Sequence, residues 1–247
     1  MRLSAFFILL CCISNMVKGQ EAVYFLAGDG LKIRGDLYLH DYKLPFIILC
    51  HQAGSNRSEF YDIAPRLLNL NYNCLAVDLR AGGKAGFTEN ETALRAQMER
   101  RPKEMLDART DLLAAIDYVH RFNKNPVILF GSSYSASLCL LAARDNPRVQ
   151  AVVAFSPGEY FQPGINMAEE ISRINKPLFI SGSQSEFIYL QKMTIHMAPD
   201  SYTLFIPEQG RGEHGARALT CEGAACDEYW FALMLFFKKV TSDSRLR

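Results

Sequence analysis

The chain has 247 residues, with 27 Lys and Arg against 26 Asp and Glu and a formal net charge of +1 at pH 7. This balance provides no electrostatic footprint for nucleic acid or for an anionic membrane, so we expect neither as a partner. Hydrophobic residues make up 49% of the chain, which excludes a largely disordered protein.

Residues 1–19 have the layout of a secretory signal peptide. A basic residue precedes a short apolar run, Ala5 to Ile13, and the segment closes on the small residue Gly19. The apolar run is well short of the roughly 20 residues that a membrane-spanning helix needs. We therefore expect cleavage before Gln20, a secreted or periplasmic protein without a stable membrane anchor, and one folded domain over residues 20–247.

The first half of the expected domain is rich in strand patterns. Residues 22–27 and 31–39 predict an antiparallel hairpin, because an Asp-Gly turn joins two alternating runs. Residues 45–50 and 73–79 are apolar runs typical of buried parallel strands, with a helix between them. Segment 82–103 is rich in glycine and charge, and we expect a loop that covers the site and shapes substrate access.

The second half alternates strands and helices. The expected strands cover 127–130, 149–155, 176–181 and 202–206, and the expected helices cover 105–122, the segment around 138–143, 185–197 and a last stretch through Trp230 and Phe236. A hairpin followed by alternating β and α units predicts an α/β fold. Its sheet would be mostly parallel and doubly wound, with antiparallel strands at the start.

Polar residues follow the predicted strand ends. Functional groups in such sheets gather at the carboxyl ends of the strands. The residues placed there are His51, Asp78, Ser133, Glu159, Glu186 and His214. Their convergence predicts a catalytic site, although His51 and Asp78 are better interpreted as structural residues of their turns.

The sharpest motif is Gly131-Ser132-Ser133-Tyr134-Ser135, which lies between a predicted strand and a predicted helix. It matches the nucleophile elbow G-x-S-x-G, except that Ser135 replaces the second glycine. Such a turn brings two backbones close together, so only small side chains fit beside the nucleophile. We assign the nucleophile to Ser133.

Four segments together resemble a known superfamily. They are His51–Ser55, Asp78–Gly83, the elbow, and His214-Gly215 late in the chain. The chain is similar to the α/β-hydrolases and, among them, to small dienelactone-hydrolase-like enzymes. The resemblance implies an α/β-hydrolase fold with a minimal lid and a serine hydrolase that cleaves a small ester or similar acyl bond. It implies no cofactor, and without a histidine cluster near the cysteines we expect no metal.

The resemblance also implies roles for individual residues. His214 would be the base, because the family order is nucleophile, acid, histidine. Glu186 follows a turn where the family commonly has an Asp one residue earlier, and Glu159 is the alternative acid. The oxyanion hole would use the backbone N–H groups of Tyr134 and of either Gln52 or Ala53.

Other functions remain open at this stage. A peptidase or an acyl transferase could use the same groups, and the irregular elbow and displaced acid are compatible with a degraded enzyme that only binds a ligand. Cys221 and Cys226 flank a four-residue loop, and an exported protein could join them in a disulfide.

Overall fold

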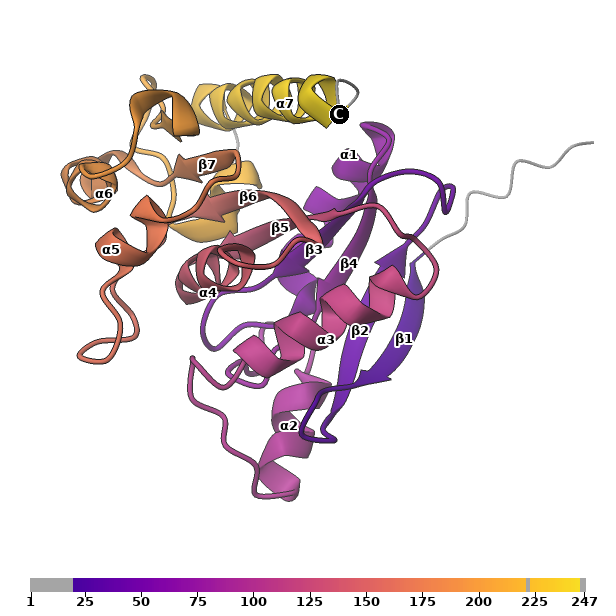
Figure 1. Cartoon of the computed structure of the whole chain (residues 1–247). Helices are drawn as coiled ribbons and strands as arrows, with labels where there is room; N and C mark the ends of the chain where they lie inside the picture. The colour runs from indigo at the N-terminus through magenta and orange to yellow at the C-terminus, as the bar shows by residue number, and fades with distance from the viewer. Residues whose placement is uncertain (1–19, 221–222, 245–247) are drawn as a thin grey trace, which may run out of the picture.

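The computed structural model describes residues 20–220 and 223–244. Eight strands form one sheet in the order β1-β2-β4-β3-β5-β6-β7-β8 (Figure 1). The antiparallel strands at one edge are β1 (Glu21–Leu26) and β2 (Lys32–Tyr38), with β2 also antiparallel to its neighbour β4. The parallel strands are β3 (Phe46–Cys50), β4 (Asn73–Val77), β5 (Val127–Ser132), β6 (Val149–Phe155), β7 (Leu178–Ser181) and β8 (Tyr202–Phe205).

Helices cover both faces of the sheet (Figure 1). The α-helices are α1 (Ile63–Asn69), α2 (Glu91–Met98), α3 (Arg109–His120), α4 (Tyr134–Ala143), α5 (Met167–Ser172), α6 (Phe187–Thr194) and α7 (Ala224–Ser244). Helices α3 to α6 contribute to one apolar core, and α1 and α7 contribute to the other. The expected doubly wound, mostly parallel sheet with an N-terminal antiparallel pair is confirmed.

Strand β5 shows why the central strands have uninterrupted apolar sequences. Leu129 packs into the core beneath α3 and α4, whereas Ile128 and Phe130 pack into the core beneath α1 and α7. Successive side chains of a strand point to opposite faces, so a strand covered on both sides needs apolar residues at every position.

Three expected elements differ from the structure. Segment 82–103 is not only a loop, because it contains α2, whose first turn is capped by the Asn90 side chain at 2.7 Å from Ala93 N. The helix expected over 105–122 begins at Arg109, after a turn in which Asp107 accepts the N–H of Glu104. The helix expected over 185–197 is shortened to α6, and α5 is an additional short helix.

The expected signal peptide, residues 1–19, lies outside the described residues, so cleavage and secretion stay predictions. Within the described part of the chain, no helix has the length and apolar character needed to cross a membrane.

Candidate active site

The elbow holds Ser133 in an uncommon backbone conformation between β5 and α4. Its φ of 60° and ψ of −126° are unfavourable for a residue with a side chain. The Ser133 N–H donates to the Phe155 carbonyl at 2.8 Å, which fixes the turn to β6. At Gly131 a Cβ would lie 2.4 Å from the Ser135 carbonyl oxygen, so this turn accepts only glycine.

Ser135, which replaces the second glycine of the usual elbow motif, has a structural role. Its hydroxyl donates to the Cys50 carbonyl oxygen at 2.6 Å and accepts the Ser132 N–H at 2.9 Å. The side chain is fully buried, so these bonds satisfy polar backbone groups at the ends of β3 and β5. The serine therefore links two strands at the elbow.

Three predicted residues meet at the carboxyl end of the sheet. His214 Nε2 lies 2.9 Å from Ser133 Oγ, and His214 Nδ1 lies 2.8 Å from Glu186 Oε1. Ser133 is buried and the Glu186 side chain is 23% exposed, whereas the His214 side chain is 46% exposed. The residues come from positions after β5, β7 and β8, so the strand order of the fold creates this line of hydrogen-bonding groups.

Electrostatics keep Glu186 charged and make His214 a stronger base than a free histidine. Burial alone would raise the pKa of Glu186, but hydrogen bonds from His214, the Ser183 N–H and the Ser156 hydroxyl outweigh it and lower the pKa to about 2. The hydrogen bond and charge of Glu186 raise the pKa of His214 above its ordinary 6.5, against the opposing effect of burial. An ionised carboxylate only accepts hydrogen bonds, so in neutral His214 the proton lies on Nδ1 and Nε2 presents its lone pair to Ser133.

The backbone after His214 is fixed by two serines that the sequence did not single out. The Gly215 N–H donates to Ser156 Oγ and the Ala216 N–H donates to Ser132 Oγ, both at 2.9 Å. Gly215 has a φ of 67°, and a Cβ there would lie 2.4 Å from Ser132 Oγ, which explains the glycine after the histidine. The available signal for Ser156 was its place directly after β6.

Glu159, the alternative acid, serves a different group. Its carboxylate accepts the N–H groups of Met167 and Ala168 at 2.9 and 3.2 Å, at the start of α5. Glu186 is thus the carboxylate that lies beside His214.

His51 and Asp78 hold neighbouring turns rather than the Ser133 side chain. His51 is fully buried, and its Nε2 accepts the Leu79 N–H at 2.9 Å. Asp78 accepts the backbone N–H of Arg57 and pairs with its guanidinium at 2.8 Å. Their positions agree with the structural roles expected for both.

The predicted oxyanion donors lie in two segments around the elbow. Tyr134 is the first residue of α4, where N–H groups have no acceptor within the helix. The Gln52 N–H donates to Glu59 Oε2 at 2.9 Å, so it is already engaged. Ala53 is therefore the better candidate for the second donor.

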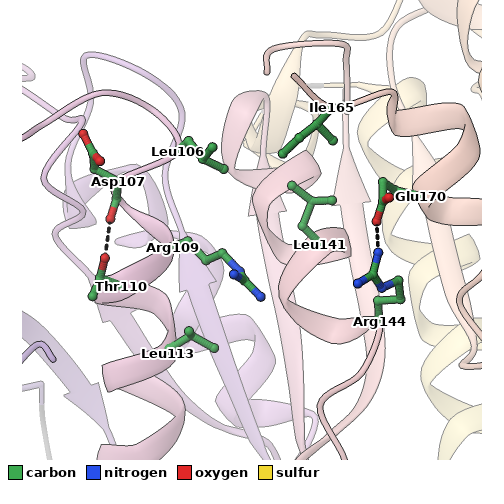
Figure 2. Close-up of a pocket in the computed structure, with 9 residues that line it drawn as sticks. All are labelled: Leu106, Asp107, Arg109, Thr110, Leu113, Leu141, Arg144, Ile165 and Glu170. Atoms are coloured by element: carbon green, nitrogen blue, oxygen red, sulfur yellow. Dashed lines mark hydrogen bonds and ion pairs between the residues drawn. The ribbon is translucent and has the colours of Figure 1, made fainter. Parts of the chain in front are cut away.

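A surface groove lies apart from these residues. A groove of about 580 Å³ runs between α3 and the pair α4 and α5, with Leu113 and Leu141 on its walls and the Arg144–Glu170 ion pair at one end (Figure 2). None of the predicted site residues lines it.

The predicted disulfide between Cys221 and Cys226 stays a prediction, because Cys221 lies outside the described residues. Cys226 is buried.

The strand order and the strained elbow together define an α/β-hydrolase fold. A model of the dienelactone hydrolase family matches residues 34–200, and the chain belongs to this family. Among solved structures it is similar to an esterase of Pyrococcus furiosus (20% identity, 90% of this chain and 91% of that one, TM-score 0.64). It is also similar to a dienelactone hydrolase of Anabaena variabilis (20% identity, 89% and 97% covered, TM-score 0.66).

Two curated proteins are more similar in sequence but longer. A polyketide transferase of Stachybotrys chlorohalonatus is 28% identical over 182 residues, which cover 66% of this chain and 57% of that protein. A quorum-quenching protein of Acinetobacter baumannii is 28% identical over 156 residues, which cover 59% of this chain and 46% of that protein. The chain thus spans about half the length of the curated relatives it matches.

Proposed function

We propose that this protein is a serine hydrolase that cleaves an ester or similar acyl bond of a small molecule. The observation that carries the proposal is the unbroken series of hydrogen bonds from Ser133 through His214 to Glu186. A serine hydroxyl is a weak nucleophile until an adjacent base accepts its proton, and a third group must orient that base. All three groups lie within hydrogen-bonding distance, in the chain order nucleophile, acid, histidine.

The chemistry follows from these positions. Ser133 Oγ attacks the acyl carbon while its proton passes to His214 Nε2, and Glu186 stabilises the resulting imidazolium. In this proposal the N–H groups of Tyr134 and Ala53 stabilise the negative charge on the carbonyl oxygen. His214 then protonates the leaving group. Water hydrolyses the acyl-enzyme by the same proton transfers in reverse, and no cofactor is required.

The cellular setting is part of the same proposal. The expected signal peptide supports action as a secreted or periplasmic protein that meets its substrate outside the cytoplasm.

Acyl transfer is a second candidate function, favoured by the resemblance to a polyketide transferase. Both reactions share the acyl-enzyme and differ only in whether water or another nucleophile accepts the acyl group. Turnover of p-nitrophenyl acetate with and without an added alcohol distinguishes them. A hydrolase gives acetate in both cases, whereas a transferase gives the new acetate ester as the main product when the alcohol is present.

Labelling with a fluorophosphonate probe tests the proposal directly, because such probes react with activated serines. We expect the purified mature protein to be labelled, Ser133→Ala to lose labelling, and His214→Ala to be labelled at least 100-fold more slowly. All three proteins need matching far-UV circular dichroism spectra. A folded wild type that resists the probe would contradict the proposal and favour a binding protein on a degraded hydrolase site.

A further inference from the structure

A tyrosine hydroxyl contacts the proposed nucleophile in addition to His214. The Tyr160 hydroxyl lies 3.0 Å from Ser133 Oγ, on the segment that follows β6. Tyr160 belongs to none of the sequence motifs of the site, and the proposed reaction does not use it. Its oxygen lies at hydrogen-bonding distance from the atom that would form the acyl-enzyme.

The direction of this hydrogen bond follows from the neighbouring groups. In the neutral form of His214, which is the form that acts as base, Glu186 holds the proton on Nδ1 and Nε2 accepts the single proton of the Ser133 hydroxyl. Ser133 Oγ then has only lone pairs to offer to Tyr160. The phenol is therefore the donor in the contact with Ser133.

The segment that carries the tyrosine is held at several points. The Ser137 hydroxyl donates to the Gly158 carbonyl at 2.7 Å and accepts the Gly158 N–H at 2.8 Å. The Glu159 N–H donates to the Tyr189 hydroxyl at 2.8 Å. The Tyr160 ring packs against Gly158, where a Cβ would lie 2.7 Å from the ring. The phenol is therefore placed before any substrate arrives.

Tyr160 and the turn expected to carry the second oxyanion donor follow different neighbours of the elbow strand. Strand β5, which carries the elbow, lies between β3 and β6. The Gln52–Ala53 turn follows β3, whereas Tyr160 follows β6. Tyr160 thus comes from a segment on the other side of β5 from the Gln52–Ala53 turn.

We propose that Tyr160 is a catalytic hydrogen-bond donor to Ser133 Oγ, a role that rests on the proposed function. Negative charge grows on Oγ as its proton moves to His214, and grows again when Oγ leaves the acyl carbon and takes the proton back. A hydrogen bond to a charged oxygen is stronger than one to a neutral hydroxyl, so the phenol stabilises both transition states more than the resting enzyme.

The test compares fluorophosphonate labelling rates of wild type, Ser133→Ala, Tyr160→Phe and Tyr24→Phe. Tyr24 is the matched control, because it lies on the edge strand β1, away from the elbow, where its hydroxyl donates to Glu91 of α2. We expect Tyr160→Phe to react about tenfold more slowly than wild type, which corresponds to about 1.4 kcal/mol. Tyr24→Phe should react at the wild-type rate.

A second variant separates the hydroxyl from general effects on folding. Gly158→Ala should displace the Tyr160 ring and slow labelling, but should add nothing in the Tyr160→Phe background. That non-additivity would support the assignment. Equal labelling of Tyr160→Phe and wild type would overturn the role of Tyr160 while leaving the hydrolase proposal intact. A wild type that is not labelled would overturn both.

Discussion

The Ser156 hydroxyl donates to Glu186 Oε2 at 2.9 Å and accepts the Gly215 N–H at the same distance. One side chain therefore contacts both the proposed acid and the backbone next to the proposed base. Ser156 has a φ of 55°, a second strained residue directly after a strand of the sheet. The strained backbone at Ser156 accompanies a hydroxyl that is held between Glu186 and the Gly215 N–H.

We predict that Ser156→Ala slows fluorophosphonate labelling several-fold. The change removes one of the hydrogen bonds that lower the pKa of Glu186 and leaves the Gly215 N–H without its acceptor. Labelling rates and urea unfolding should be measured together. Ser172→Ala, an exposed serine on α5, is the control and should match wild type. Unchanged labelling of Ser156→Ala would show that Gly215 and Glu186 are held well enough without it.

Much of this arrangement could be predicted, because strands and turns have strong local signals. Ser133, Glu186 and His214 were placed from the strand ends that precede them and from motif order. The contacts of Ser156 and Tyr160 could not be predicted, since they depend on how closely the segments after β5, β6, β7 and β8 approach one another.

The shorter elements show the same limit. Helices α2 and α5 are 8 and 6 residues long, and each begins at an Asn whose side chain caps the first turn. Helices of this length are marginal alone and depend on tertiary contacts. In α2, for example, Thr92 Oγ1 accepts the Arg34 N–H of β2 at 3.0 Å. A hydrophobic pattern of one or two turns does not distinguish such a helix from a loop.

The pH dependence of labelling should identify the acid. Neutral His214 is the reactive form, and Glu186 raises its pKa above 6.5, so the wild-type rate should rise with pH through a midpoint above 6.5 and then level off. In Glu186→Gln this interaction is lost, so the midpoint should move to lower pH. The plateau should fall by roughly 10²- to 10⁴-fold, because the amide no longer fixes the productive tautomer.

Glu159→Gln is the matched control for that profile, because its carboxylate lies at the start of α5. It should keep the wild-type midpoint and plateau. A midpoint that shifts in Glu159→Gln but not in Glu186→Gln would reverse the assignment of the acid.

Restoring the usual glycine at Ser135 should weaken the protein. Ser135→Gly removes the hydroxyl that joins the Cys50 carbonyl to the Ser132 N–H and leaves both buried groups without this partner. We expect a loss of about 1–3 kcal/mol in the free energy of unfolding, measured with urea. Ser135→Ala should show most of the same loss while keeping a helix-favouring residue in α4. Wild-type stability of Ser135→Ala would instead indicate that the hydroxyl contributes little.

Gly82, in the turn after β4, packs closely against the turn that carries Gln52 and Ala53. A Cβ at Gly82 would lie 2.3 Å from the Ser55 carbonyl oxygen and 2.6 Å from His51 Cε1. Because both neighbours are held in place, Gly82→Ala must separate the two turns.

We expect Gly82→Ala to lower the free energy of unfolding by about 1–3 kcal/mol. Labelling should also slow under conditions where the variant is folded, because the proposed Ala53 donor moves away from the elbow. Gly28→Ala is the control, since its Cβ would meet only Thr110 Cγ2 at an ordinary 3.8 Å. If Gly82→Ala unfolds at the wild-type urea concentration, the two turns are not packed as tightly as these distances require. If Gly82→Ala is destabilised but is labelled at the wild-type rate, the turn that carries Gln52 and Ala53 does not supply the oxyanion donor.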